Sequence, residues 1–452
     1  MMHQRHSVRF TIKENDNQKK ETEDMNIRIY NARILTMEEG RPLFEGELHV
    51  KGNRITYVGN SLSKEDLCGQ VDWDREIDAN DNVIMPGFKN AHTHSAMTFL
   101  RSYADDLPLL EWLNEQIFPM EAKLTDEDIY HLSKLAIMEY LTSGITANFD
   151  MYLTPDTIAK ASRDCGFRTV MVGGMNNFSQ SLEKLEEWFL RYNNPEDLVT
   201  FQLGFHAEYT NSKENLENLA KLAQKYKAPI CAHSSESKSE VEGCIERYGM
   251  TPTVLFDKLG MFDYGGTYYH CIHLTDEDIE LMAQKGIYVV TNPASNMKLA
   301  SGIARVEDML AKGVHVAIGT DGPSSNNCLD MFREMFLVTA LAKIKSNNAA
   351  AMSADTVLQM ATVEGARCMG LHDADVLAEG KLADFIMIDL QQPNMQPLNN
   401  IVKNIVYSGS KQNVKMTVVN GNILYEDGEF FIGTSKEKVY AKANEIIQRM
   451  KA

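Results

Sequence analysis

The middle of the chain repeats one pattern, a short apolar run followed by a longer amphipathic stretch. The runs have the length of buried strands, and stretches such as 126–144, which follows a Thr-Asp cap signal, have helical spacing. Eight strands alternating with helices predict an α/β fold of the (β/α)8 barrel type. The eight runs lie at 82–88, 144–150, 168–174, 200–206, 228–233, 266–270, 286–291 and 314–321.

The two ends of the chain have a different residue pattern from the middle. Residues 26–84 and 381–434 contain short β-rich runs broken by Gly and Asn, with Asn-Gly and Asp-Gly turn signals in the second segment. Each segment is too small to form a core alone, so we expect them to pair into a small β-sandwich beside a barrel over 85–380. We expect a helix over 435–452 and a disordered extension over the polar residues 1–25.

Composition limits the partners that the chain can have. The formal net charge is -18, and an acidic surface repels phosphate backbones, so we expect no nucleic acid but a small neutral or cationic substrate. A solvated surface without functional meaning explains the charge equally well.

No run of 18 apolar residues predicts a membrane span, and the first residues lack the apolar region of a signal peptide. Seven scattered cysteines without CxxC spacing favour reduced thiols in a cytoplasmic protein.

Histidines gather where the chemistry of such a barrel is expected. Active-site residues of these barrels lie at the carboxyl ends of the strands. In strand order, the residues at the predicted ends are His92 and His94 (strand 1), His206 (strand 4), His233 (strand 5), His270 (strand 6) and Asp321 (strand 8).

Four of these residues predict a metal site. His92 and His94 have the i, i+2 spacing that places two side chains on one face of a strand, so both can reach one ion. An imidazole from His233 and a carboxylate from Asp321 complete a nitrogen and oxygen set suited to one Zn²⁺, and also to Fe²⁺. An HxH pair alone also arises by chance, and buried histidines are often only hydrogen-bonded. Glu236 is either a proton shuttle beside the metal-activated water or a solvated glutamate in a polar loop.

Several segments make the chain resemble the amidohydrolase superfamily and, within it, the 5-methylthioadenosine/S-adenosylhomocysteine deaminases. The likeness runs from Asn26 to the last strands, with its motifs in the order HxH, lone His, HCxH, NPASNxKL and GTDG. The segments that carry it are MPGFKNAHTHSAMTFLR, EWLNEQIFPMEAKLT, GITANFDMY, GFHAEYT, HCIHLTDED, TNPASNMKLASGIA and GTDGPSSNN.

The resemblance implies a role for each matching residue. Glu121 corresponds to the glutamate that holds the ribose hydroxyls, His206 to a histidine on the purine, and Trp112 to an aromatic near the sugar or its 5′ substituent. Apart from the resemblance, Glu121 and Trp112 would be ordinary helix residues. The metal ligands correspond to His92, His94, His233 and Asp321, the proton shuttle to Glu236, and the residues that hold the attacking water to His270 and Asp321.

The activity that the resemblance implies is hydrolytic deamination of an adenosine-type nucleoside to the inosine analogue and ammonia. A single metal ion is implied as well, because the strand that ends in His206 lacks the lysine that binuclear relatives carboxylate. Two alternatives on the same ligands are a guanine-type deaminase and a triazine chlorohydrolase. A non-catalytic metal-binding protein is a more distant alternative, because it would need neither Glu236 nor His270. A homo-oligomer is expected on general grounds.

One departure from the family pattern concerns the 5′ group of the substrate. Relatives that take S-adenosylhomocysteine have arginines after the third strand that clamp its carboxylate, whereas here Arg168 begins that strand and Gly173 and Gly174 occupy its far end. An unclamped carboxylate would be poorly compensated, so we expect neutral groups, as in methylthioadenosine, 5′-deoxyadenosine or adenosine, unless a loop arginine from elsewhere replaces the clamp. After strand 8, Ser324, Ser325 and Asn326 either line the pocket or form a polar turn.

Overall fold

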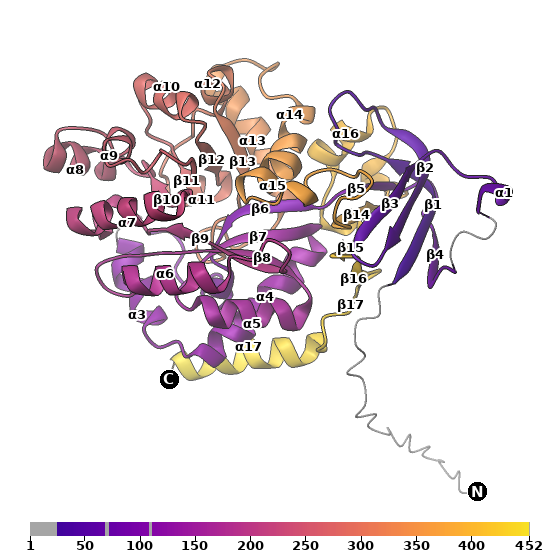
Figure 1. Ribbon diagram of the computed structural model, residues 1–452, viewed down its shortest axis with the longest axis horizontal. Helices are drawn as coiled ribbons and strands as arrows, with labels where there is room; N and C mark the ends of the chain where they lie inside the picture. The colour runs from indigo at the N-terminus through magenta and orange to yellow at the C-terminus, as the bar shows by residue number, and fades with distance from the viewer. Residues whose placement is uncertain (1–24, 68–71, 108–110, 452) are drawn as a thin grey trace, which may run out of the picture.

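The structure is a computed structural model that describes residues 25–67, 72–107 and 111–451. The extension expected over 1–25 lies outside these residues, apart from Met25. Figure 1 shows two parts, a large barrel surrounded by helices and a smaller sheet to its right. Both parts were predicted from the sequence.

Eight parallel strands form the barrel, each paired with its neighbours in sequence order. This confirms the predicted (β/α)8 fold. The interior of the barrel is filled by side chains from successive strands, among them Ala91, Phe149 and Tyr269. The strands are β6 (Phe88–Thr93), β7 (Ile145–Met151), β8 (Arg168–Val172), β9 (Val199–Gly204), β10 (Ile230–Ser234), β11 (Gly266–His270), β12 (Tyr288–Thr291) and β13 (His315–Ile318).

The barrel closes where β13 meets β6. The amide of Asp321 donates to the carbonyl oxygen of His92 at 3.0 Å. The side chain of Asn90 bridges the same gap, since its Oδ1 accepts from the Thr320 amide at 2.9 Å and its Nδ2 donates to Thr320 Oγ1 at 2.7 Å. Gly319 permits this close approach, because a Cβ there would lie 2.8 Å from the backbone nitrogen of His92. Closure therefore brings the first and last strand ends together.

Helices follow the strands and cover the barrel. The capping signal at Thr125 is confirmed, because Thr125 and Asp128 form a reciprocal capping box at the start of the first long helix. The helices are α4 (Asp126–Thr142), α5 (Pro155–Cys165), α6 (Leu182–Arg191), α7 (Lys213–Tyr226), α8 (Lys238–Tyr248), α9 (Pro252–Lys258), α10 (Asp276–Gln284), α11 (Pro293–Lys298), α12 (Val306–Ala311), α13 (Met331–Ser346), α14 (Ala354–Gln359) and α15 (Gly365–Cys368).

Shorter helical segments and the long C-terminal helix α17 complete the chain. Two of them, η1 and η2, belong to the long excursion between β6 and α4, and α17 lies along the lower edge of the molecule in Figure 1. The segments are α1 (Lys64–Leu67), η1 (Ser95–Leu100), η2 (Trp112–Ile117), α3 (Phe118–Glu121), η3 (Glu208–Thr210), η4 (Met360–Glu364), η5 (His372–Ala374), η6 (Pro393–Met395), α16 (Ile401–Lys403), η7 (Asn404–Ser408), η8 (Lys411–Asn413) and α17 (Lys436–Lys451).

The smaller sheet is built from both ends of the chain, as predicted. Hydrogen bonds join its nine strands into one mostly antiparallel sheet, and strands from the two ends share a single apolar core that contains Leu48, Phe385 and Val418. The strands are β1 (Asn26–Ile34), β2 (Phe44–Lys51), β3 (Arg54–Gly59), β4 (Arg75–Asp78), β5 (Val83–Pro86), β14 (Phe385–Ile388), β15 (Val414–Val419), β16 (Asn422–Glu426) and β17 (Glu429–Phe430).

The position predicted for the first barrel strand was wrong. The run 82–88 is divided, because its first part forms β5 of the smaller sheet and the barrel strand β6 begins only at Phe88. Gly87 separates the two, and the methyl and hydroxyl of Thr146 occupy the space that a side chain there would fill. One apolar run therefore serves two sheets.

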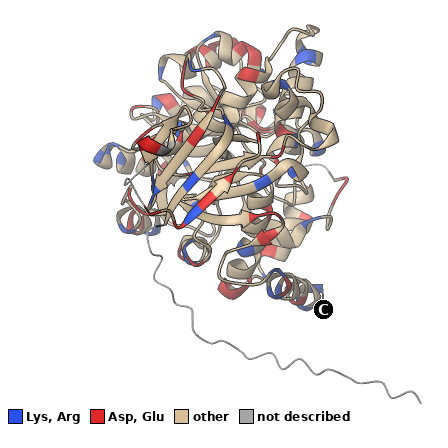
Figure 2. Cartoon of the chain, turned by 90° about the vertical axis from the view of Figure 1, so that its right-hand side faces the viewer, with Lys and Arg blue, Asp and Glu red and all other residues tan. Residues whose placement is uncertain are grey.

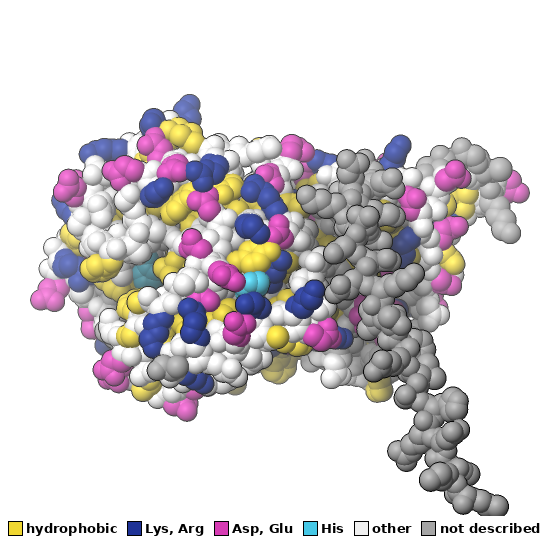
Figure 3. Space-filling view, turned by 90° about the horizontal axis from the view of Figure 1, so that it is seen from below, with side chains coloured by type: hydrophobic (Ala, Val, Ile, Leu, Met, Phe, Trp, Pro, Cys, Tyr) yellow, Lys and Arg dark blue, Asp and Glu magenta, His cyan; other side chains and the backbone are white. Residues whose placement is uncertain are grey.

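The outer surface carries charges of both signs. In Figure 2, which faces the smaller sheet, basic and acidic side chains are interspersed. Figure 3, seen from the side of α17, shows small hydrophobic patches between charged side chains. None of the helices in the described ranges is long and apolar enough to span a membrane. Six cysteines in these ranges are free, which agrees with the expected reduced thiols.

Candidate active site

The predicted metal ligands meet at the carboxyl end of the barrel. His92 belongs to β6, His94 follows it directly, and Asp321 lies three residues after β13. Because the barrel closes between these strands, Oδ1 of Asp321 lies 3.5 Å from Nε2 of His92 and 3.2 Å from Nε2 of His94. The three residues form a group whose candidate ligand atoms lie within 4.8 Å of one another.

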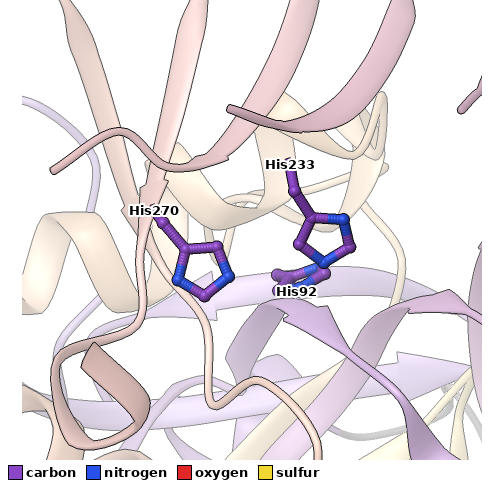
Figure 4. A group of neighbouring side chains, drawn as sticks. All are labelled: His92, His233 and His270. Carbon is purple, nitrogen blue, oxygen red and sulfur yellow. The ribbon is translucent and has the colours of Figure 1, made fainter. Parts of the chain in front are cut away.

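A second group of the same kind shares His92 with the first and adds His233 and His270. These two side chains come from the ends of the neighbouring strands β10 and β11, and in Figure 4 their rings and that of His92 point toward a common space. The five residues together surround a single centre rather than two separate ones.

Hydrogen bonds orient the imidazoles. Nδ1 of His94 lies 2.6 Å from the Met151 carbonyl oxygen, and Nδ1 of His233 lies 2.8 Å from that of His206. Each Nδ1 therefore donates, which turns Nε2 of both rings toward the centre. Nδ1 of His270 is 2.8 Å from Oδ1 of Asn296.

His92 supplies the clearest sign that a ligand belongs here. Both of its ring nitrogens are buried and have no hydrogen-bond partner among the residues that the structure describes. A stacked contact with Tyr269, with ring centroids 3.8 Å apart, holds the ring in place. Since buried polar groups are nearly always satisfied, the unpartnered His92 and the free Nε2 atoms of its neighbours fit a bound divalent cation.

Burial sets the protonation states in this centre. It lowers the pKa of His92 to about 3 and that of His233 well below its usual range, so both imidazoles are neutral, as a metal ligand must be. Burial alone would also lower the pKa of His94, but the adjoining Asp321 carboxylate raises it to about 9. For Asp321, burial opposes ionisation, yet the close approach of its carboxylate to the His92 and His94 imidazoles holds its pKa well below the usual value.

Asp321 is held by hydroxyl and amide donors. The Ser295 and Ser325 hydroxyls donate to its Oδ2 at 2.6 and 2.8 Å, and the Gly322 amide donates to Oδ1 at 2.8 Å. Its backbone is left-handed, with φ +58°. These contacts direct Oδ1 toward His92 and His94 and keep Oδ2 turned away.

Glu236 lies at the same centre and is buried, not solvated. Its Oε2 is 3.9 Å from Nε2 of His270, and burial raises the pKa of its carboxyl. A carboxyl group with a raised pKa next to a metal-ligand set is suited to take up and return a proton.

A cavity of about 660 Å³ opens onto this centre. Glu121 (in α3), His206 and Trp112 (in η2), to which the resemblance gave substrate contacts, all line it. Oε1 of Glu121 is buried and has no hydrogen-bond partner in the described part of the chain, and burial raises the pKa of this carboxyl. His206 contacts Thr210, with Nδ1 3.3 Å from Oγ1, and burial lowers its pKa to about 4.

For the three residues after β13, the sequence left open whether they line the pocket or form a polar turn, and the structure gives a different answer for different residues. Ser324 and Ser325 line the cavity. Asn326 does not, because its amide donates inward to the Thr320 carbonyl oxygen at 2.6 Å and to Oε1 of Glu334 at 2.8 Å. Asn326 therefore supports the turn from behind.

Several cavity residues were missed from the sequence. Tyr152 follows β7 directly and could have been found by the rule that strand ends carry the site. Phe178 and Gln180 lie in a loop and Tyr209 lies in the short segment η3, and no pattern marked them. Phe178 is 87% exposed at the cavity rim, an unusual position for a large apolar side chain.

Arg168 does not line this cavity. It starts β8 and is buried in an ion pair with Asp384, whose Oδ2 is 2.5 Å from its Nε. Within the described ranges, no lysine or arginine lines the cavity. Arg168 is therefore engaged in the fold and is not placed to contact a ligand in the cavity.

Comparison with known proteins agrees with this geometry. The model described as "Amidohydrolase family" matches residues 83–424. A 5-methylthioadenosine/S-adenosylhomocysteine deaminase from Caldicellulosiruptor saccharolyticus is 39% identical over 429 residues, covering 94% of this chain and 99% of that protein. A protein of the same name from Desulforamulus reducens is 42% identical over 406 residues, covering 88% and 93%. The crystal structure of an adenosine deaminase from Xanthomonas campestris with bound zinc matches with a TM-score of 0.89 and 31% identity, covering 94% of this chain and 99% of that one.

Proposed function

The chain belongs to the amidohydrolase family, and on that basis we propose that it deaminates an adenosine-type nucleoside hydrolytically, giving the inosine analogue and ammonia. The enzyme is a metal-dependent hydrolase that acts on a cyclic amidine C–N bond. The curated relatives and the zinc-containing adenosine deaminase support this reaction for a chain that matches them over nearly its whole length.

The observation that carries the proposal is that one cavity joins Glu121 to the metal-ligand centre and to Glu236. A buried carboxylate oxygen without a partner needs a donor, and the two vicinal hydroxyls of a ribose supply two. Guanine and aminotriazines carry no such hydroxyl pair, so Glu121 favours a nucleoside over those alternatives.

We assign the metal ligands as His92, His94, His233 and Asp321, and zinc as the ion. Their donor set of three imidazole nitrogens and one carboxylate oxygen suits zinc, and zinc is present in the similar adenosine deaminase. A divalent ion bound there would lower the pKa of a water molecule toward about 7 and so supply a nucleophile at neutral pH.

Glu236 is the proton carrier of the proposed reaction. Its carboxylate takes a proton from the attacking water and delivers it to N1 of the adenine ring, which makes C6 electrophilic. His270 and Asp321 orient the water toward C6. When the tetrahedral intermediate collapses, Glu236 takes the proton of the new C6 hydroxyl and passes it to the leaving amino group, so that C6 becomes a carbonyl and ammonia departs.

The remaining assigned residues place the nucleoside. Glu121 accepts from the ribose hydroxyls, His206 contacts the purine, and Trp112 packs near the sugar or its 5′ substituent. Holding C6 over the attacking water in this way reduces the barrier by several kcal/mol, on the order of the effect of proximity in other enzymes.

We propose that neutral 5′ groups are preferred, as in methylthioadenosine, 5′-deoxyadenosine and adenosine. The described cavity lining offers no cation for the carboxylate of S-adenosylhomocysteine, and its rim is apolar at Phe178 and Phe118. We also propose a cytoplasmic location, with no nucleic-acid or membrane partner. A homo-oligomeric state stays a prediction.

A substrate panel tests the proposed reaction. Ammonia release is measured for methylthioadenosine, 5′-deoxyadenosine, adenosine, S-adenosylhomocysteine and guanine, and chloride release for a chlorotriazine. We expect ammonia from the nucleosides and neither product from the other two compounds. Turnover of guanine or the triazine without turnover of any nucleoside would replace the proposal by the corresponding alternative.

A further inference from the structure

The turn that carries Glu236 is held by one buried side chain, that of Glu240. Oε1 of Glu240 accepts from the Ser235 amide at 2.8 Å, and its Oε2 accepts from the Glu236 amide at 2.8 Å. Ser235 is left-handed, with φ +51°, a conformation that a serine adopts only when its surroundings hold it there. Glu240 is 5% exposed, so both bonds are protected from water.

This arrangement differs from the helix cap that the sequence suggests. Glu240 is the third residue of α8 after the N-cap Ser237, the position from which a carboxylate usually closes a capping box. Asp128 in α4 and Asp278 in α10 do so, because each accepts from the amide of its own N-cap threonine, at 2.8 and 2.9 Å. Glu240 instead reaches back past its cap to the two residues of the active-site turn.

The other side of the same turn is tied to the strand that carries His270. The carbonyl oxygen of Ser235 accepts from the amides of Ile272 and His273, both at 3.0 Å. The peptide groups around Ser235 are therefore held on their amide side by Glu240 and on their carbonyl side by the turn after β11. These bonds set the position from which the Glu236 side chain faces His270.

We propose that Glu240 is a positioning residue for the proton transfer by Glu236, an inference that rests on the proposed function for its kinetic consequence. Two adjacent N–H donors need two acceptor oxygens at the spacing of a carboxylate. A glutamine would offer only one, and its NH2 group would face the second amide as donor against donor. The turn would then relax, and Glu236 would move relative to the adenine N1.

The predicted kinetic effect is selective. Substrate is bound by Glu121, His206 and the apolar rim, and the metal by side chains whose hydrogen bonds do not involve Glu240. Displacing the proton carrier should therefore lower kcat and leave KM and metal content unchanged. A misplacement of about 1 Å can reduce a rate by about 100-fold.

The test compares Glu240→Gln with Glu246→Gln, which makes the same chemical change at an exposed position of the same helix. With methylthioadenosine, we expect Glu240→Gln to lower kcat by about 10-fold to 100-fold, with KM within about twofold and zinc content equal to that of the wild type. We expect Glu246→Gln to match the wild type in all three.

Hydrogen exchange provides a readout that needs no activity. We expect slow exchange of the Ser235 and Glu236 amides in the wild type and faster exchange of these two in Glu240→Gln, with no such change in Glu246→Gln. If Glu240→Gln does not fold, Glu240→Asp, which keeps the charge but shortens the reach, is judged by the same measurements.

Three results would overturn the inference: a kcat for the Glu240 variant within about twofold of the wild type, a loss expressed in KM or in zinc content, or fast exchange of both amides in the wild type. If the wild type releases no ammonia from any nucleoside, the proposed function fails, and the exchange data alone decide whether Glu240 holds the turn.

Discussion

Both ends of the barrel bury charged and polar side chains, but the two ends differ in whether these side chains have hydrogen-bond partners. At the amino end, Lys89 and Arg168 are each satisfied by protein groups. At the carboxyl end, the His92 ring and Oε1 of Glu121 are buried without any hydrogen-bond partner in the described ranges. Because unsatisfied buried groups reduce stability, the contrast indicates that the carboxyl end is arranged for ligands and the amino end for the fold itself.

The amino end is fastened to the smaller sheet. The guanidinium of Arg168 donates to both carboxylate oxygens of Asp384, at 2.5 and 3.1 Å, and to Oδ1 of Asn420 at 3.2 Å. Lys89 is fully buried, and its Nζ donates to the Gly87 carbonyl oxygen at 2.8 Å and to Thr146 Oγ1 at 2.9 Å. The Arg168 contacts join segments that lie 216 and 252 residues apart in the sequence.

Three residues at or beside the ends of barrel strands have an unusual backbone conformation. Ser235, His270 and Asp321 are left-handed, with φ of +51°, +69° and +58°, and all three lie at the carboxyl end. Such conformations are held at a site where side-chain direction matters more than local stability. His270 and Asp321 are themselves assigned to the reaction, and Ser235 directly precedes Glu236.

The largest expected effect comes from changing the proton carrier. Glu236→Gln keeps the size of the side chain but cannot carry the proton, so we expect kcat for methylthioadenosine to fall by about 1,000-fold. Zinc content, measured on the same preparation, should equal that of the wild type. Retained turnover would show that Glu236 does not carry the proton.

At the other end of the barrel, Arg168→Ala should affect stability and not activity. Removing one partner leaves the Asp384 carboxylate buried and unpaired, so we expect the free energy of unfolding to fall by about 3 kcal/mol, with kcat/KM nearly unchanged. Urea denaturation and ammonia release measure the two. Arg163→Ala is the matched control, because it breaks an exposed pair with Asp197 and should change stability by less than about 1 kcal/mol. Equal losses in the two variants would remove the distinction between the barrel ends.

The cavity should discriminate between 5′ groups. We expect kcat/KM for methylthioadenosine to exceed that for S-adenosylhomocysteine by about 30-fold, equivalent to about 2 kcal/mol for a charged group without a partner. Phe178→Arg, at the exposed rim of the cavity, should narrow this ratio by offering a cation. Equal or inverted values in the wild type would contradict the preference for neutral groups.

The smallest expected effect is the contribution of Lys89 to the pH dependence of the free energy of unfolding. Burial lowers its pKa to about 8 from 10.5, so between these values the unfolded chain binds more protons than the folded one, and stability rises with pH. Relative to Lys89→Met, the wild type should gain about 1 kcal/mol between pH 7 and pH 9. Urea denaturation of both proteins measures it, and other titrating groups cancel in the difference. A difference that does not change with pH would mean that Lys89 titrates normally.

The sequence predicted the barrel, and it predicted that the four proposed metal ligands lie at one end of it, because both predictions depend on short-range patterns. Alternating apolar runs and amphipathic stretches indicate strands and helices, and the fold then places strand ends together, so His233 and Asp321 could be assigned despite their separation. The run 82–88 was misplaced because an apolar run shows that a strand is buried without showing in which sheet. Here Met85 belongs to one sheet and Phe88 to the other.

Other parts of the site depend on contacts that no local pattern encodes. Glu121 and Trp112 lie on helical segments and were found only through resemblance. Glu240 has the spacing of an ordinary capping residue, and only the structure shows that it binds the Glu236 turn. For Asn326 the sequence left a pocket-lining role and a polar turn equally open, and only the structure shows that its amide faces inward to Glu334.

The most direct test of the metal site at the carboxyl end is a zinc titration of metal-free protein, followed by ammonia release from methylthioadenosine. The account predicts no activity without metal and a linear rise that ends at one zinc ion per chain. Activity that survives metal removal, or a rise that continues to a second equivalent, would contradict it.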